Sequence, residues 1–221
     1  MRRWATLLLA VAPVVFGAER ATERLQDTAD VFRDIMATPD KGIPRDLIEK
    51  SRCIVIVPGL KKGAFVVGVE LGKGFISCRE ANGNWSAPGA VRVEGGSVGF
   101  QIGGSDTDVV MLVMNNRGAE KLLRSQFTLG AEGEIAAGPV GRDASAETDA
   151  EMRAEILSWS RTHGVFAGLA LKGATLRTDE DANAELYGRK MDNKQIVDSR
   201  MAPPPAAGRL IEMLSRYPQH V

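Results

Sequence analysis

Apolar and small side chains recur at helical spacing near the start of the chain. Between Glu19 and Ala37 they occupy one face, at positions 21, 25, 28, 29, 32, 35 and 36, which predicts an amphipathic helix. The opposite face carries five carboxylates and three arginines, a net charge of −2. A second, shorter helix is expected over Pro44–Lys50.

From Cys53 the pattern changes to short apolar and β-branched runs that glycines separate. Turns are expected at Pro58-Gly59 and Leu71–Gly74, with further breaks at Gly95-Gly96 and Gly103-Gly104. No helical pattern intervenes, so we expect an antiparallel meander that curls into a barrel or sandwich. The stretch Val109–Met114 is apolar at every position and predicts a central strand covered on both faces. The expected strands are Cys53–Val57, Ala64–Glu70, Phe75–Arg79, Trp85–Glu94, Val98–Gly103 and Asp108–Met114.

The rest of the chain mixes short helices with one hairpin. Asn116 is expected to cap a helix over Arg117–Arg124, and Gly188 to close another over Asp179–Tyr187. Two runs flank a turn at Thr162–Gly164 and predict the hairpin. Gly130–Gly141 is expected to be irregular with one short strand, and Ala206–Arg216 to form a final amphipathic helix. The predicted fold is therefore α+β, a glycine-rich antiparallel sheet with an N-terminal helix and short flanking helices.

The first 17 residues have the three-part layout of a signal peptide. Arg2 and Arg3 precede the apolar run Trp4–Phe16, and cleavage is expected after Gly17. The alternative is a buried N-terminal helix. No later apolar run is long enough to span a membrane. We therefore expect a single domain over residues 18–221, exported to the periplasm or cell envelope.

Composition excludes several function classes. Lys and Arg together number 28, as do Asp and Glu, so a strongly basic nucleic-acid-binding protein is not expected. With two histidines and no C-x-x-C or phosphate-loop motif, we expect no metal and no cofactor. Cys53 and Cys78 are either a possible disulfide or two buried thiols.

One motif suggests an enzyme. Gly95–Gly99 matches G-x-S-x-G around Ser97, and Asp143 and His163 follow in the order of a serine hydrolase. That motif requires a helix directly after the serine, whereas strand is expected here. We therefore expect no enzyme and keep an envelope serine hydrolase using Ser97 as the alternative.

Two basic groups are candidates for binding anions. Lys61 and Lys62 follow a predicted turn, and Arg117, Lys121 and Arg124 form a stripe at helical spacing. Their alternative role is that of solvated surface. The carboxylates Asp106, Asp108 and Asp179–Asp181 are interpreted as strand-end and helix-cap residues rather than as a site.

Within residues 51–188, several stretches resemble the SYLF-domain family. They occur in the family's order and with its spacing. The resemblance begins with SRCIVIVPGLKKGAFVVGVELGKGFISCRE and continues through Trp85–Asn115, Phe127–Ala144 and Ile156–Gly188. It implies a lipid-binding module. Eukaryotic members bind phosphoinositide membranes and, in the yeast branch, actin. With its expected signal peptide this chain looks like an exported bacterial member, for which those two ligands are not expected.

Together these observations predict a non-catalytic lipid-binding module of the envelope. Its headgroup contacts are expected from Lys61, Lys62, Arg117, Lys121 and Arg124. A structural scaffold that binds another envelope protein is the second alternative.

Overall fold

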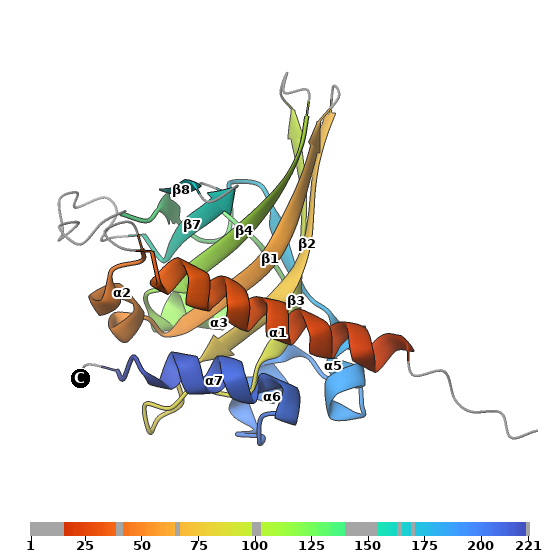
Figure 1. Cartoon of the computed structure of the whole chain (residues 1–221), viewed down its shortest axis with the longest axis vertical. Helices are drawn as coiled ribbons and strands as arrows, with labels where there is room; N and C mark the ends of the chain where they lie inside the picture. The colour runs from red at the N-terminus through yellow and green to blue at the C-terminus, as the bar shows by residue number, and fades with distance from the viewer. Residues whose placement is uncertain are drawn as a thin grey trace, which may run out of the picture.

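The computed structural model describes residues 16–38, 42–64, 67–98, 103–139, 154–162, 165–168 and 171–219. A curled sheet forms its centre, and the long N-terminal helix α1 (Phe16–Met36) crosses one face of it (Figure 1). The predicted α+β class, the curled sheet, the N-terminal helix and the short flanking helices are confirmed.

Nine strands form the sheet in the described residues: eight follow the order β5-β9-β3-β2-β1-β4-β7-β6, and β8 pairs with β7 beside this path. All pairs are antiparallel except β6 with β7, which is parallel. The short connection 129–134 joins β5 to β6, the two ends of the sheet, so the sheet curls into a half-barrel. The strands are β1 (Cys53–Ala64), β2 (Val67–Cys78), β3 (Gly89–Val98), β4 (Gly103–Val113), β5 (Gln126–Thr128), β6 (Ile135–Ala137), β7 (Ile156–Thr162), β8 (Val165–Gly168) and β9 (Thr175–Thr178).

The expected turns at Pro58-Gly59 and Leu71–Gly74 are wrong. Strand β1 runs through the first with a bulge between Val57 and Leu60, and β2 runs through the second. Close packing explains the glycines of β2. A Cβ on Gly74 would lie 2.0 Å from the carbonyl oxygen of Ile56. Glycine is needed there for the close approach of two strands.

The glycine pairs further along are also inside strands, Gly95-Gly96 in β3 and Gly103-Gly104 in β4. The strands do not form a simple meander, because β4 pairs with β1 and not with β3. The far parts of β1 to β4 project together beyond the helices (Figure 1). We call this projection the arm and define it by residues 61–64, 67–71, 94–98 and 103–106.

Apolar side chains are buried on both faces of the sheet. On the helix side, Ile54, Ile56 and Phe75 pack against α1 and the other helices. On the inner side of the curl, Val55 and Met111 pack against residues from both ends of the sheet. Every residue from Val109 to Val113 is buried, so the prediction of a central, doubly covered strand is confirmed.

The helices lie close to their predicted positions. The apolar stripe of α1 is buried except for Met36, which is partly buried. Ion pairs join the polar face of α1 to the sheet through Arg161 and to the last helix through Arg209. Helix α6 and strands β5 and β9 were not expected. The remaining helices are α2 (Arg45–Lys50), α3 (Asn116–Leu122), α5 (Glu180–Tyr187), α6 (Asn193–Asp198), the 3-10 helix η1 (Pro205–Ala207) and α7 (Gly208–Ser215).

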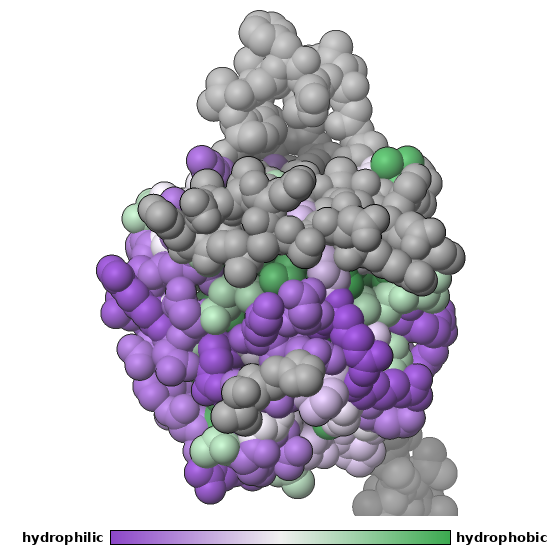
Figure 2. Space-filling view, turned by 90° about the vertical axis from the view of Figure 1, so that its left-hand side faces the viewer, coloured by the Kyte–Doolittle hydropathy of each residue, from purple (hydrophilic) through white to green (hydrophobic). Residues whose placement is uncertain are grey.

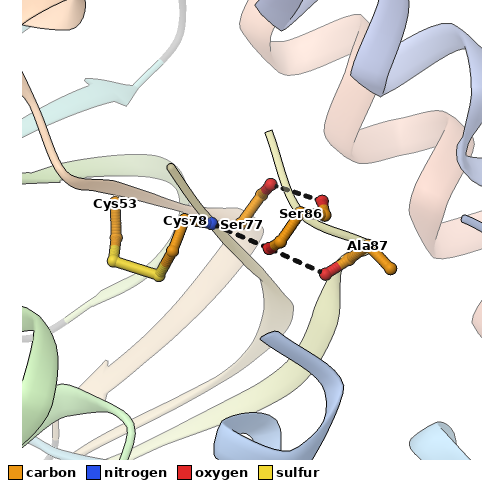
Figure 3. Close-up of a disulfide and its surroundings, with 5 residues drawn as sticks. All are labelled: Cys53, Ser77, Cys78, Ser86 and Ala87. Carbon is orange, nitrogen blue, oxygen red and sulfur yellow. Dashed lines mark hydrogen bonds between the residues drawn. A yellow bond between two sulfur atoms is a disulfide. The ribbon is translucent and has the colours of Figure 1, made fainter. Parts of the chain in front are cut away.

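A disulfide joins Cys53, the first residue of β1, to Cys78, the last residue of β2 (Figure 3). The two residues are direct partners in the sheet and face the inner core. Beside them, the Ser77 hydroxyl donates to the Ser86 carbonyl, and the Cys78 amide donates to the Ser86 hydroxyl. Of the two alternatives that the sequence left open, the structure has the bonded pair.

Candidate binding surface

The register of the sheet places four side chains in a row across the arm. Lys61 is the direct partner of Leu71 on β2 and of Asp106 on β4, and Leu71 is the partner of Glu94 on β3. Direct partners share a face of the sheet. Leu71 lies four residues before Phe75, so the row faces the helix side, beyond the helices. We call Glu94, Leu71, Lys61 and Asp106 the arm row.

The arm row is exposed and carries both signs of charge. Leu71 is 54% exposed, one of two large apolar side chains so exposed among the described residues. Lys61, whose side chain is 77% exposed, lies 3.5 Å from a carboxylate oxygen of Asp106. An exposed ion pair of this kind is weak and leaves both groups available to a ligand.

Two arginines extend the arm row toward the edge of the sheet. Arg92 on β3 and Arg177 on β9 are direct partners, and each lies 3.2 Å from a carboxylate oxygen of Glu94. Two guanidinium groups therefore share one carboxylate. The surface thus consists of one exposed leucine and three basic side chains. Nearby carboxylates neutralise part of their positive charge.

The expected lipid-binding residues lie in two separate places. Lys61 is in the arm row, and the side chain of Lys62 lies outside the described part. Arg117 and Lys121 lie on α3, which follows the opposite end of β4. Val113 lies seven positions after Asp106 along β4, about 23 Å of extended chain.

The basic side chains of α3 contact a carboxylate. Lys121 donates to both carboxylate oxygens of Glu155, at 2.9 and 3.0 Å, and Arg117 lies 3.4 Å from the same group. These residues line a hollow of about 500 Å³ together with Glu132 and Glu134. Arg124 is exposed. Because carboxylates surround Lys121, the arm row is the better candidate for binding an anion.

The other carboxylates serve the fold. Asp108 accepts two hydrogen bonds from Arg161 and one from the amide of Gly59, which fixes the bulge of β1. Asp179 caps α5, as expected, and lies 2.8 Å from the ammonium of Lys73. Within the described ranges, no group of three potential metal ligands occurs.

Ser97 lies inside β3, which runs from Gly89 to Val98, and the next described element is strand β4. The helix that a nucleophile elbow requires does not follow it. A Cβ on Gly95 would lie 3.2 Å from that of Ala174, so this glycine permits close packing. Asp143 and His163 lie outside the described residues.

On the side of the molecule where α2 and β8 lie, hydrophilic residues dominate the coloured surface (Figure 2). Apolar residues form only small patches among them. None of the helices in the described part has the length and apolar character to cross a membrane.

Sequence reasoning missed Leu71, Arg92 and Arg177 as surface residues. Gly72 and Gly74 predict a turn that includes Leu71, and no sequence pattern predicts β9. The available signal was alternation, since Leu71, Lys73 and Phe75 share one face of an unbroken strand.

The fold and the arm row define an α+β domain with an exposed, mixed-charge sheet surface. The chain belongs to the Ysc84 family, whose model is described as "Las17-binding protein actin regulator" and matches residues 94–217, more than half of the chain. The predicted SYLF resemblance is confirmed at the level of this family.

Relatives occur in yeasts and mammals. An SH3 domain-containing protein of Schizosaccharomyces pombe is 37% identical over 176 residues, which cover 78% of this chain and 41% of that protein. LAS seventeen-binding protein 3 of Saccharomyces cerevisiae is 34% identical, covering 79% and 39%. SH3 domain-containing YSC84-like protein 1 of Homo sapiens is 30% identical, covering 81% and 52%. The chain thus spans about two fifths to one half of these relatives.

The location expected from the sequence, a periplasm or cell envelope, is wrong. The relatives come from organisms without a bacterial envelope, and their names refer to SH3 domains and Las17 binding. An envelope protein as partner is no longer expected for the same reason. The described residues begin at Phe16, so the signal peptide over residues 1–17 stays a prediction.

Proposed function

We propose that this chain is a non-catalytic binding module and that the arm row contacts an anionic lipid surface. The observation that carries the proposal is the adjacency of Lys61 and Leu71, both exposed, on the part of the sheet that projects beyond the helices. An aliphatic side chain beside a cation suits the boundary between lipid headgroups and acyl chains. The resemblance to a lipid-binding family supports the same ligand.

The charges of the arm row set the strength of this contact. Asp106 and Glu94 oppose an anionic surface, while Lys61, Arg92 and Arg177 favour it. The local balance is a single positive charge. Binding is therefore expected to be weak, to require anionic lipid and to fall with salt.

A protein partner of the actin-regulating kind is the second candidate. The description of the family model and the names of the yeast relatives favour it. Mixed charges around one exposed leucine also suit a polar protein interface with an apolar centre. This candidate uses the same arm row, so the two differ in their ligand and not in their site.

The substitution Lys61→Glu is expected to weaken binding to anionic vesicles by about tenfold. Each basic side chain at such a surface contributes about 1 kcal/mol, and the substitution replaces attraction by repulsion. Co-sedimentation with phosphatidylserine vesicles measures the change. Lys194→Glu is the matched control, because Lys194 is similarly exposed but lies on α6. Equal binding by wild type and Lys61→Glu would refute the lipid proposal.

Pelleting with actin filaments separates the two candidates. Under the lipid proposal, wild type pellets with anionic vesicles and not with filaments, and Leu71→Asn weakens the vesicle contact. If wild type instead pellets with filaments alone and Lys61→Glu abolishes it, the protein partner replaces lipid. Retention of all binding by both variants would remove the arm row as the site.

A further inference from the structure

Four arginines gather where α2, the end of β2 and the C-terminal segment meet. Arg45 lies with its guanidinium 5.0 Å from the ring centre of Tyr217, and Arg79 lies 3.8 Å above that of Trp85. Arg52 lies close enough for its charge to act on Arg79, and Arg216 directly precedes Tyr217. The nearby carboxylates Glu49 and Glu212 already bond Arg45 and Arg216. Glu80, in the turn beside Arg79, is a third carboxylate and accepts a hydrogen bond from Asn82. The four arginines therefore outnumber these three carboxylates by one.

Arg79 is the most deeply buried member of this group, at 5% exposure. Its two terminal nitrogens donate to backbone carbonyls, at 3.0 Å to Gly83 and 2.5 Å to Tyr217. Its Nε is buried and has no hydrogen-bond partner. Within the described ranges, no carboxylate lies within ion-pair distance of Arg79. A buried guanidinium without a contacting acid is costly unless an anion accompanies it.

The charge on Arg79 persists at neutral pH. Burial, and then the positive charge of Arg52, lowers the pKa of Arg79 to about 10. This value lies well above neutral pH, so the guanidinium stays protonated. A ligand that supplies negative charge would raise the pKa of Arg79 again, as the carboxylate of Glu49 already does in part.

A hollow of about 300 Å³ opens beside Arg79, between the turn at residues 80–84 and the C-terminal segment. Asn84 and Gln219 contribute side-chain amides to its wall, and Trp85 contributes its ring. None of the described residues that line it is acidic. The wall therefore combines a buried cation with uncharged hydrogen-bond donors.

We propose that this hollow binds a phosphate group, held by Arg79, Asn84 and Gln219. Each terminal nitrogen of Arg79 gives one N–H to a carbonyl, which leaves one N–H on each for a ligand. A planar carboxylate would be satisfied by these two donors and would not need Asn84 or Gln219. A tetrahedral dianion instead accepts from donors in several directions and interacts with both Arg79 and Arg52. The site is separate from the arm row and does not rest on the proposed function.

The test adds one negative charge to the wall of the hollow. Asn84 is exposed, and within the described residues its side chain makes no hydrogen bond, so Asn84→Asp preserves shape and fold. A like charge at contact distance is expected to weaken phosphate binding by about fivefold or more. Asn116→Asp is the matched control, because Asn116 is equally exposed but does not line the hollow.

Binding is measured by titrating inorganic phosphate at constant ionic strength and following the NMR signals of the Gly83 amide and the Trp85 indole. We expect a saturable shift in wild type and Asn116→Asp, and a weakened one in Asn84→Asp. The proposal is overturned if wild type shows no saturable shift, if Asn84→Asp titrates like wild type, or if acetate binds as tightly as phosphate.

Vesicles containing phosphatidic acid identify the source of the phosphate. If Asn84→Asp weakens both inorganic phosphate and vesicle binding, the natural ligand is a lipid headgroup. If it weakens inorganic phosphate alone, the ligand is a free phosphate compound. Both results support the site. Neither depends on Lys61, so a failure of the arm-row proposal can be distinguished from a failure of the phosphate site.

Discussion

Replacing Phe32 with alanine is expected to lower the free energy of unfolding by about 3–5 kcal/mol. Phe32 is 1% exposed and lies in the middle of the buried stripe of α1. Its ring packs edge-on against Tyr217, with the ring centres 5.8 Å apart. The substitution removes this contact and leaves a cavity beside α1. Urea denaturation followed by circular dichroism measures the loss.

The control for this prediction lies on the other face of the same helix. Gln26 is exposed, so Gln26→Ala is expected to change the free energy of unfolding by less than about 0.5 kcal/mol. Comparable stability of Phe32→Ala and Gln26→Ala would show that α1 does not cover core in solution.

Removing the disulfide is expected to lower the free energy of unfolding by about 3 kcal/mol. The bond closes a loop between residues 25 positions apart and restricts the unfolded chain. It also fixes the open end of the hairpin of β1 and β2, at the end opposite the arm. The urea midpoint of wild type, measured with and without a thiol reductant, gives the effect.

The variant with both Cys53 and Cys78 replaced by alanine controls for side effects of the reductant. Its urea midpoint is expected to lie close to that of reduced wild type. The two proteins differ only in the two small buried thiol groups that the variant lacks. It is also expected to be insensitive to reductant. A wild type whose midpoint is unmoved by reductant, with its thiols shown to be free, would contradict the prediction.

Helices were predictable because their signals are local. The stripe of α1 repeats within a few residues, and the ends of α5 coincide with a capping aspartate and a closing glycine at φ +74°. Asn115, rather than Asn116, caps α3, an offset of one residue. The apolar run of β4 predicted its central place because few apolar residues can remain exposed.

The long strands were not predictable in the same way. Gly72 and Gly74 resemble a turn in sequence, and only the position of the neighbouring strand β1 shows that they serve close packing. The short strands β5 and β9 gain their structure from each other and from β3. Contacts between segments distant in sequence determine these strands, and such contacts leave no local pattern in the sequence.

The candidate sites also differ in whether their signals in the sequence are local or tertiary. Lys61 could be chosen from sequence because it lies in a short basic run. The exposure of Leu71 required the register of four strands. Arg79 follows an apolar strand and is indistinguishable there from an ordinary surface arginine. Its burial depends on Trp85 and on the carbonyl of Tyr217, which is 138 residues away along the chain.

The order β3-β2-β1-β4 constrains how the chain folds. Strands β1 and β2 are adjacent in sequence and can pair first, with Ala64 opposite Gly68. Every pair between β1 and β4 closes a much longer loop, from Ala64 with Gly103 to Cys53 with Val113. Long-range pairing of this kind slows folding. The hairpin of β1 and β2 is therefore expected to act as a template, with its two edges unsatisfied until β3 and β4 add to them, one on each side.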